Sequence, residues 1–561
     1  RQRQMCIRDR YYLFLIILIV PNIVLCFTEP MPLVAKVCNV LLPFSIYHMI
    51  MSWSGNCGKT FWILFPFLFF GAFQIVLLYL FGQSVIAVDM FLNLVTTNPG
   101  EALELLDNLI PAIIIVVLLY IPALVLAAVA VSEKRRLSET FVRRERKRAR
   151  ITVIAGILSL VAAYLFDARY ELKSDLYPAN VCYNIALAFQ RTAQTQHYAE
   201  TSKDFTFQAK TTRPEKNREV YVMVIGETSR AANWSIYGYN RNTNPELTKI
   251  KGLTAFSHVL TESNTTHKSV PMLMSSVTAH DFNSIYRQKG IITAFKEAGY
   301  RTAFFSNQRY NHSFIDFFGK EADICDFIKE DTGDGSYNPS DDELLKLVAA
   351  ELAENASKQF IVLHTYGSHF NYRERYPADN AFFLPDFPVD AELKYKDNLI
   401  NAYDNSIRYT DNFLARLIRM LQEQDIDAAM LYTSDHGEDI FDDDRHLFLH
   451  ASPVPSYYQI HVPFLVWMSD NYRKNYPDFL KNAEINRQKN ISSSASFFQT
   501  MLELGGIDTP SRNDSLSVIN ASYTEKNRVY LNDHNEARSL NDIGMREEDF
   551  TMLQTKGIVY R

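Results

Sequence analysis

Long apolar stretches separated by short polar ones fill the first third of the chain. Each stretch is close to the roughly 20 residues that a helix needs to cross a bilayer, and charged residues inside them are few. A soluble core helix could explain one such stretch but not five in succession. The pattern predicts a transmembrane domain of five helices in residues 1–168, over Tyr11–Phe27, Met31–Trp53, Phe61–Phe81, Leu109–Val131 and Ile151–Phe166.

A basic segment between the fourth and fifth stretches sets the expected orientation. Lys134–Arg150, which we expect to be a loop, contains nine Lys or Arg residues. Such loops stay on the cytoplasmic side of a membrane, so the fifth helix should emerge on the other side. We therefore expect the loop Gly82–Asn108 and everything after Asp167 to lie outside the cytoplasm.

Residues 169–218 have the pattern of a connector. The stretch "YPANVCYNIALAFQRT" predicts a short helix at the membrane surface, with Tyr183, Leu187 and Phe189 available to lipid. The polar stretch Thr201–Arg218 is typical of an extended linker.

From Glu219 onward, short apolar runs alternate with helical patterns. The runs are Glu219–Ile225, Thr302–Phe305, Phe360–His364, Ala428–Tyr432 and Val462–Trp467, and the helical patterns are Ile291–Ala298, Asp341–Glu354, Ala402–Leu421 and Ser493–Leu504. Continuous apolar runs are typical of strands that are buried on both faces. We therefore predict an α/β domain in residues 219–561, with a mainly parallel sheet sandwiched by helices.

Composition adds little to this picture. The net charge of −6 is mild, and we expect no nucleic-acid partner. Of the six cysteines, four lie in or next to the apolar part and only Cys182 and Cys325 lie beyond it. The sequence therefore predicts no disulfide framework.

Two of the predicted strands end in residues that can hold a metal. Asp435 and His436 end the stretch "LYTSDHGE", and Glu227 lies in "GETSR" after the first run. An adjacent Asp-His pair alone often caps a helix. The carboxyl ends of parallel strands, however, meet at one edge of a sheet. Two oxygen ligands and one nitrogen ligand suit zinc, and manganese could also bind.

A hydroxyl-rich stretch follows the first strand and could supply a nucleophile. Thr261–Ser276 offers Ser263, Thr265, Thr266 and Ser269. Any one of these hydroxyls could simply cap a helix. A hydroxyl beside a bound metal and a helix N-terminus would instead be activated for attack.

The outer loop carries three polar residues four positions apart. Asn93, Thr97 and Glu101 would share one face of a helix. Because Pro99 would disturb such a helix, a solvated loop is the interpretation that the residues alone favour.

Five motifs together resemble those of the phosphoethanolamine transferases of Gram-negative envelopes. In order they are "GETSR", "TTHKSVP", "HTYGSHFNYRERYP", "SDHGE" and "LHAS". That family includes the lipid A modifying enzymes behind polymyxin and colistin resistance. The resemblance covers nearly the whole chain. It implies a multi-pass inner-membrane protein whose catalytic domain, similar to alkaline phosphatases and sulfatases, lies in the periplasm.

The resemblance also implies the chemistry. Thr266, which precedes "HKSVP", matches the nucleophile, and Glu227, Thr266, Asp435 and His436 match a zinc site. Phosphoethanolamine would pass from phosphatidylethanolamine to Thr266, and then to lipid A, a core sugar or another glycan. We expect a monomer.

The resemblance assigns substrate contacts to further residues. His369 and His450 match histidines that bind the transferred phosphoryl group or a second metal. Asn93, Thr97 and Glu101 match the substrate-binding residues of the outer loop, which displaces the solvated interpretation of that loop.

The chain departs from this family beside the nucleophile. Relatives have two disulfide-bonded cysteines there, whereas this chain has Asn264 and Met272. We therefore expect packing alone to hold the loop, in a divergent branch whose acceptor the resemblance does not identify.

Three other functions compete with this prediction. A phosphoglycerol transferase of the lipoteichoic-acid-synthase type would share five spans and a Thr nucleophile, but "NLVTTNPGE" and "TTHKSVP" favour ethanolamine. A sulfatase would need the C/S-x-P-x-R signature, which this sequence lacks. A catalytically dead envelope scaffold would not need the full set of metal-ligand residues.

Overall fold

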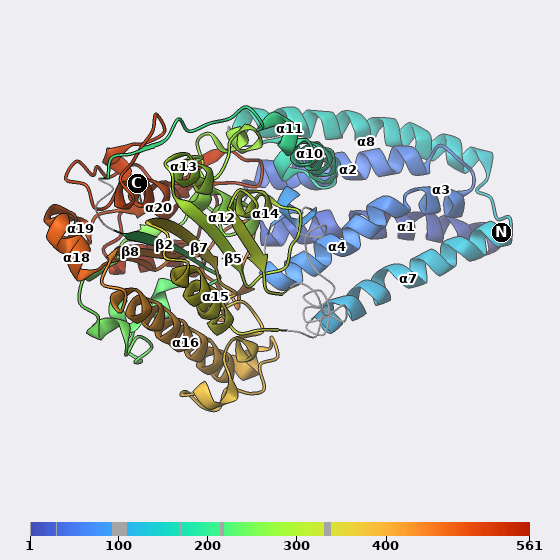
Figure 1. Ribbon diagram of the computed structural model, residues 1–561. Coiled ribbons are helices and arrows are strands. Elements are labelled where there is room, and N and C mark those ends of the chain that lie inside the picture. The colour runs from blue at the N-terminus through green and yellow to red at the C-terminus, as the bar shows by residue number, and fades with distance from the viewer. Residues whose placement is uncertain are drawn as a thin grey trace. The chain divides into compact units, whose positions relative to one another are not determined.

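A computed structural model describes residues 2–29, 31–82, 84–91, 109–167, 170–213, 218–329 and 338–560 (Figure 1). The chain divides into two compact units, which meet in sequence between Arg191 and Thr192. We call them the N-terminal and the C-terminal unit.

The N-terminal unit consists of apolar helices. In the part of the unit that the structure describes, four are long and apolar enough to cross a membrane: α1 (Gln2–Thr28), α2 (Leu33–Met51), α7 (Ile110–Ser132) and α8 (Glu139–Phe166). A pair bent by 60°, α3 (Cys57–Ile63) and α4 (Phe65–Phe81), could form a fifth span. The predicted third helix, Phe61–Phe81, is therefore broken. The break precedes Pro66, which has no N–H to donate to the preceding turn and so fits the first turn of a new helix.

The basic segment Lys134–Arg150 is mostly helical, which corrects the prediction of a loop. Helix α8 begins at Glu139, and the Ser138 hydroxyl accepts a hydrogen bond from the N–H of Phe141 at 3.4 Å. The helix then continues into the last apolar stretch without a break. The helix predicted in the connector is also present, as α10 (Ala179–Gln196), after the short α9 (Leu172–Asp175), and its place at the membrane surface stays a prediction.

The C-terminal unit is built on a seven-stranded sheet. Its strand order is β3 (Leu253–Phe256), β11 (Phe464–Met468), β8 (Asp427–Ser434), β2 (Glu219–Gly226), β7 (Lys358–His364), β5 (Arg301–Ser306) and β6 (Ile324–Phe327). The five strands from β8 to β6 are parallel, whereas β11 is antiparallel to both its neighbours. The mainly parallel sheet is thus confirmed, with β11 as its exception.

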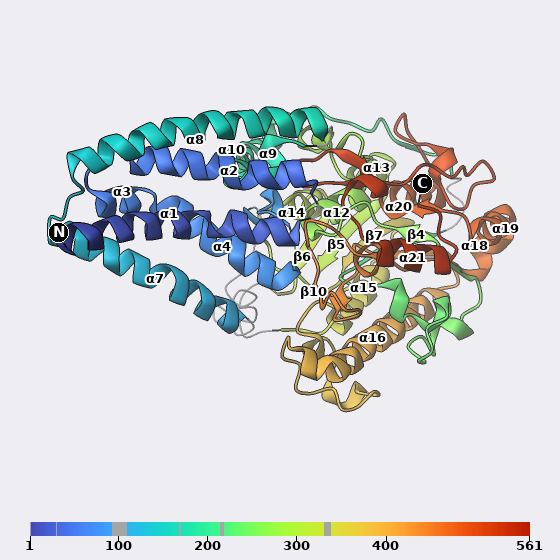
Figure 2. The same cartoon turned by 180° about the vertical axis from the view of Figure 1, so that it is seen from behind.

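Helices cover both faces of this sheet (Figures 1 and 2). Tyr221, Met223 and Ile225 of β2 pack in a core with residues of α12 (Thr266–Met274), α13 (Ile291–Glu297), α14 (Phe314–Gly319) and α20 (Ser493–Leu504). The alternate residues Val220, Val222 and Val224 pack with α15 (Asp342–Ala353) and α16 (Lys396–Gln422). Since successive side chains of a strand point to opposite faces, both faces bury apolar residues, which explains the continuous apolar run.

Smaller elements complete the unit. The short helices are α11 (Tyr198–Thr201), α17 (Tyr457–Ile460), α18 (Asp470–Asn475), α19 (Pro477–Asn486) and α21 (Glu547–Thr555). The short strand pairs are β1 (Lys210–Thr211) with β13 (Ile507–Asp508), β4 (Val259–Leu260) with β12 (Ile491–Ser492), β9 (Asp439–Ile440) with β10 (Phe448–Leu449), and β14 (Val529–Leu531) with β15 (Ala537–Ser539).

The predicted linker is in part bound to the C-terminal unit. Phe207 is buried in its core, and β1 pairs with β13. The guanidinium of Arg213 lies 3.6 Å from the ring centroid of Tyr476 and donates to the carbonyls of Glu503 and Leu504. Linker residues Phe207–Arg213 therefore pack as part of the C-terminal unit.

Candidate active site

The carboxyl ends of β2 and β8 bring the predicted metal ligands together. The register pairs Gly226 with Ser434, so Glu227 and Asp435 follow side by side. The N–H of Asp435 donates to the carbonyl of Gly226 at 3.0 Å, which ties the two turns together. Glu227, Asp435 and His436 are all buried, with at most 1% of each residue exposed.

The three side chains converge on one point. Nε2 of His436 lies 3.3 Å from Oδ2 of Asp435 and 3.5 Å from Oε1 of Glu227. One ligand atom from each residue lies within 4.8 Å of the others, as a shared metal ion requires. The structure thus brings together the O/O/N set that the sequence predicted.

Hydrogen bonds fix the orientation of these ligands. Oδ1 of Asp435 accepts from the N–H groups of Thr228 and His436, and Oδ2 accepts from the hydroxyl of Ser269 at 3.1 Å. Nδ1 of His436 lies 2.9 Å from the carbonyl of Gly437, and we assign the ring proton to that nitrogen. Nε2 then presents a lone pair to the cluster, which is the usual arrangement of a metal-binding histidine.

The four candidate hydroxyls have different contacts in the structure, and only some of them contact the metal-ligand residues. Thr266 begins α12, and its Oγ1 lies 3.1 Å from both Oε1 of Glu227 and Nε2 of His436. Ser269 donates to Asp435, while the hydroxyls of Ser263 and Thr265 lie 3.1 Å from each other. The N-cap position belongs to Thr265, so capping does not explain the placement of Thr266.

The charge balance of the cluster suits a bound cation. Burial raises the pKa of Asp435 and raises that of Glu438 to about 8. Burial opposes a charge on His436, but Asp435 and Glu227 outweigh it and raise the pKa of His436. Among the described residues, His436 is the one basic side chain paired with Glu227 or Asp435. Two carboxylates, an imidazole and a hydroxyl can supply the coordination of a catalytic zinc ion.

His369 and His450 lie next to this cluster. His369 comes after β7 and His450 directly after β10. Their ring centroids are 5.7 Å apart, and the ring of His450 lies 4.3 Å from that of His436. Together with Glu227 they form a second group that could hold a metal. Burial lowers the pKa of both to about 3, so each ring is neutral at pH 7.

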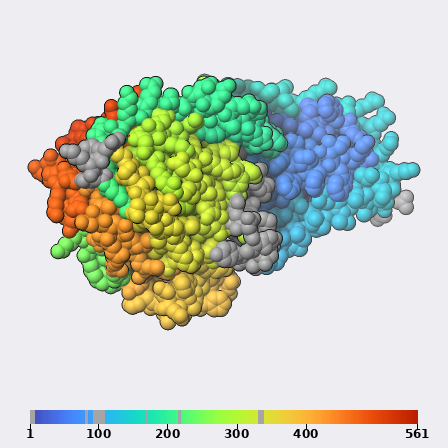
Figure 3. All heavy atoms as spheres, in the orientation of Figure 1, coloured from blue at the N-terminus to red at the C-terminus, as the bar shows by residue number. Residues whose placement is uncertain are grey.

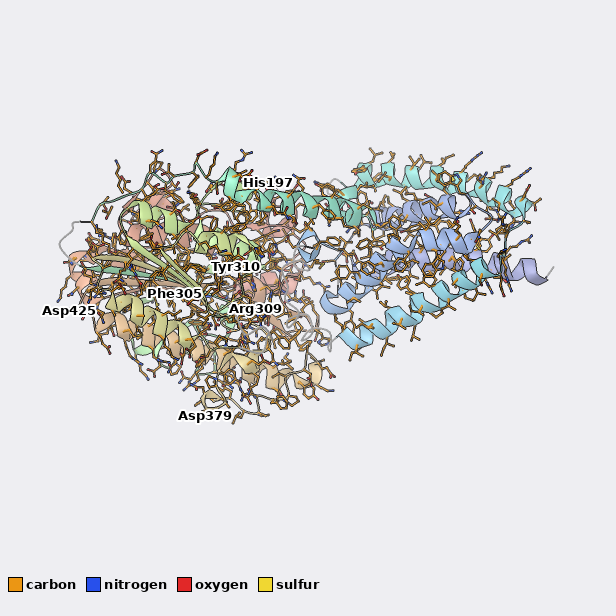
Figure 4. The ribbon with its side chains drawn as sticks, turned by 45° about the vertical axis from the view of Figure 1, so that its right-hand side comes forward. His197, Phe305, Arg309, Tyr310, Asp379 and Asp425 are labelled. Carbon is orange, nitrogen blue, oxygen red and sulfur yellow. The ribbon has the colours of Figure 1, made fainter. Side chains whose placement is uncertain are left out.

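Two further polar residues at this site were not predicted from the sequence. Glu438 contacts Nδ1 of His450 through Oε2 at 2.7 Å, and its Oε1 accepts from the hydroxyl of Tyr372. It is the last residue of the motif "SDHGE", so a signal was present. Gln308, which follows β5 and precedes the labelled Arg309 in Figure 4, donates to Oε2 of Glu227 at 3.0 Å. A single Gln in a loop carries no comparable signal.

Hydrogen bonds hold the loop before the nucleophile, so the expectation of packing alone was wrong. The side-chain nitrogen of Asn264 donates to the carbonyl of Ser452 at 2.8 Å and to Oε1 of Gln459 at 2.5 Å. Its oxygen accepts from the hydroxyl of Tyr530 at 2.6 Å. A buried amide can make all these bonds at once, and it joins the loop to two distant segments without a disulfide.

Asn93, Thr97 and Glu101 lie outside the described residues. Their assignment to the substrate site stays a prediction from the sequence.

Two family models match the chain. Residues 219–507, just over half of its 561 residues, match the model described as Sulfatase. Residues 56–193 match the model described as Phosphoethanolamine transferase EptA/EptB.

Two curated relatives each match about half of the chain. The Kdo(2)-lipid A phosphoethanolamine 7''-transferase of Escherichia coli (strain K12) is 32% identical over 304 residues, which are 52% of this chain and 51% of that protein. Phosphoethanolamine transferase EptC of Escherichia coli O18:K1:H7 (strain RS218 / NMEC) is 27% identical over 319 residues, 55% and 54% of the two chains. The chain therefore spans about half the length of the curated relatives it matches.

Solved structures share the fold. The lipooligosaccharide phosphoethanolamine transferase A (EptA) from Neisseria meningitidis, an integral membrane protein, matches with a TM-score of 0.71 and 20% identity, over 91% of this chain and 97% of that one. The C-terminal periplasmic domain of EcEptC from Escherichia coli in complex with Zn matches with a TM-score of 0.55 and 24% identity, over 61% and 97%. Apolar helices followed by a sulfatase-like α/β domain are thus an established arrangement.

Proposed function

The chain belongs to the sulfatase family, and we propose that it transfers phosphoethanolamine from phosphatidylethanolamine to lipid A or another lipopolysaccharide group. The match of its N-terminal part to the phosphoethanolamine transferase model supports this choice of group over phosphoglycerol. The name of the Escherichia coli relative, a Kdo(2)-lipid A transferase, supports the acceptor class.

One observation carries the proposal. The hydroxyl of Thr266 lies 3.1 Å from a carboxylate oxygen of Glu227 and from Nε2 of His436, at the sheet edge where α/β folds place their chemistry. A dead scaffold would have no reason to point a half-buried hydroxyl at such a cluster.

Glu227, Asp435, His436 and Thr266 would hold a zinc ion. When bound, zinc would lower the pKa of the Thr266 hydroxyl and offset the negative charge of the phosphodiester. Manganese accepts similar ligands, but the imidazole favours zinc.

The transfer would proceed in two displacements. Oγ1 of Thr266 attacks phosphorus and passes its proton toward Oε1 of Glu227, the acceptor of its hydrogen bond. The bond from phosphorus to the glycerol oxygen breaks, and diacylglycerol leaves after it takes up a proton. Phosphoethanolamine is then held covalently on Thr266.

The second displacement reverses the first. An oxygen of the acceptor attacks the same phosphorus, the bond to Thr266 breaks, and Thr266 takes back a proton. His369 and His450 are neutral, and their Nδ1 atoms face the carbonyl of Phe370 and the carboxyl group of Glu438, so their other ring nitrogens can hold a second metal ion or take up the proton of an attacking acceptor hydroxyl. Both substrates are lipids, which accounts for apolar helices on the same chain. We place the protein in the inner membrane, as a monomer with its C-terminal unit in the periplasm.

Mass spectrometry of lipid A tests the proposal. Cells without other phosphoethanolamine transferases would express the chain or its Thr266→Ala variant. We expect lipid A, or another envelope glycan, to gain phosphoethanolamine with the first and not with the second. If full-length chain with bound metal modifies neither lipid A nor any other glycan, the proposed function is wrong.

A further inference from the structure

A loop of the C-terminal unit exposes large apolar side chains that the proposed chemistry does not use. The loop, "FFLPDFP" over Phe382–Pro388, lies between β7 and α16. Phe382 is 57% exposed, Leu384 66% and Phe387 70%. Gold atoms of this part of the chain lie at the surface in Figure 3, and Asp379, three residues before the loop, lies at the periphery in Figure 4.

The loop turns its one charged residue inward. Asp386 is buried, and its Oδ2 accepts from the hydroxyl of Tyr376 at 2.7 Å and lies 3.1 Å from Nε of Arg373. A loop in water ordinarily does the opposite, because charges gain hydration and apolar groups lose it. The exposed surface of this loop is therefore apolar by arrangement as well as by composition.

Three asparagines of α16 hold the loop in this shape. Asn398, Asn401 and Asn405 lie three and four residues apart, on one face of the helix. Asn398 and Asn401 donate to the carbonyls of Pro388 and Pro385, at 3.2 and 2.8 Å. These hydrogen bonds attach the backbone of the loop to α16 and so fix the position of its exposed side chains.

Asn405 pairs with three backbone groups at the start of the loop. Its Oδ1 accepts from the N–H groups of Phe382 and Phe383 at 2.9 and 2.8 Å, and its amide donates to the carbonyl of Phe383 at 3.0 Å. Pro385 and Pro388 have no N–H at all. Backbone groups that are paired or absent lose no hydrogen bond to water when a segment enters an apolar medium.

Two cations lie against the rings of the loop. The guanidinium of Arg408 lies 4.1 Å from the ring centroid of Phe382, and that of Arg241 lies 4.4 Å from that of Phe383. Aromatic rings with adjacent basic groups are typical of the interface between lipid tails and phosphate head groups.

We propose that Phe382, Leu384 and Phe387 insert into the surface of a phospholipid bilayer and so give the C-terminal unit a second membrane contact. The chain itself carries helices that can span a bilayer, so the protein has a phospholipid surface available to it. A protein partner would also bury apolar rings, but the basic groups beside these rings suit the phosphate head groups of lipid. The inserted loop limits how the C-terminal unit can turn over the membrane.

Site-specific photo-crosslinking tests this contact in the full chain. p-Benzoylphenylalanine replaces Phe387 in one variant and Ile485 of α19 in the other, and both are reconstituted in nanodiscs of phosphatidylethanolamine and phosphatidylglycerol. Ile485 is a matched control because it is 61% exposed, on the same unit. After irradiation, mass spectrometry should detect phospholipid adducts at position 387 several-fold above position 485.

Two results would overturn the proposal. Equal lipid adducts at the two positions would mean that the loop has no particular contact with lipid. A crosslink from position 387 to a second copy of the chain, or to another protein, in place of lipid would make the loop a protein interface. Both variants keep the proposed nucleophile and metal ligands, so the outcome does not depend on the proposed reaction.

Discussion

Nδ1 of His450 lies 2.7 Å from Oε2 of Glu438, and both residues are held inside the candidate site. The other carboxylate oxygen of Glu438 accepts from the hydroxyl of Tyr372. We assign the proton of this hydrogen bond to Nδ1 of His450, with Oε2 of Glu438 as its acceptor, so that Nε2 is left for substrate or metal. Glu438 therefore acts as the residue that orients His450.

We predict that Glu438→Gln lowers transfer roughly tenfold to a hundredfold, the usual effect of losing the partner of a metal-site histidine. The amide keeps the shape of the carboxyl group but replaces one of its oxygen acceptors with an N–H donor. The measurement is the transfer rate, with the metal content as a second readout. Tyr372→Phe is the matched control, and we expect it to have a smaller effect. Equal transfer rates for Glu438→Gln and the unaltered protein would mean that Glu438 does not orient His450 for the reaction.

Thr266→Ala should abolish transfer and leave the fold and the metal content largely intact. The hydroxyl contacts Glu227 and His436, but the remaining two carboxylates and imidazole keep most of the ligand set. Transfer assays and metal analysis of the purified variant check this. Thr266→Ser should retain part of the activity, because it keeps the hydroxyl. Product formation by the Ala variant at a near-normal rate would rule out Thr266 as the nucleophile.

Asn264→Ala should destabilise the protein and disorder the loop that carries the nucleophile. The change removes one buried hydrogen bond each from the hydroxyl of Tyr530, the carbonyl of Ser452 and Oε1 of Gln459. A buried polar group that loses its partner costs about 1–3 kcal/mol. Thermal unfolding of the full chain measures the loss, and Asn513→Ala, in an exposed surface turn, is the control. A variant as stable as the control would mean that packing does hold this loop.

We expect the C-terminal unit to fold alone and bind zinc, but only if it includes the bound part of the linker. The burial of Phe207 alone is worth about 1.5–3 kcal/mol. A fragment that begins at Thr192 should therefore be more stable to urea than one that begins at Glu219. Midpoints of urea unfolding and zinc content of the two fragments test this. A longer fragment that is unfolded, or that holds no metal, would contradict the prediction.

The sequence predicts those parts of the fold that depend on local patterns. The continuous apolar runs Glu219–Ile225 and Ala428–Tyr432 predict the positions of β2 and β8. Because these strands are parallel neighbours, the residues at their carboxyl ends lie close together. The strand β6 escaped detection because it is only half-buried and has no continuous apolar run. The direction of β11 depends on how the chain returns to the sheet, which no local pattern encodes.

The same limit applies to the site. Glu227, Asp435 and His436 follow strands, so topology alone brings them together. Gln308 and Asn264 matter through bonds to residues far away in the chain, to Glu227 and Tyr530 among others. Since Asn and Gln are common in loops, such bonds become visible only in three dimensions.

The last prediction concerns Glu101, which the resemblance assigns to the substrate site. A carboxylate there can pair with the ethanolamine ammonium, and losing such a bond costs about 1.5–3 kcal/mol, or roughly tenfold to a hundredfold in rate. Glu101→Ala should therefore slow transfer from phosphatidylethanolamine yet spare hydrolysis of a small soluble phosphodiester, which has no ammonium to bind. Glu101→Gln, which keeps the shape, should be impaired in the same way if charge is the cause. Equal loss with both substrates would mean that Glu101 supports the fold, and no loss with either would make the loop a solvated connector.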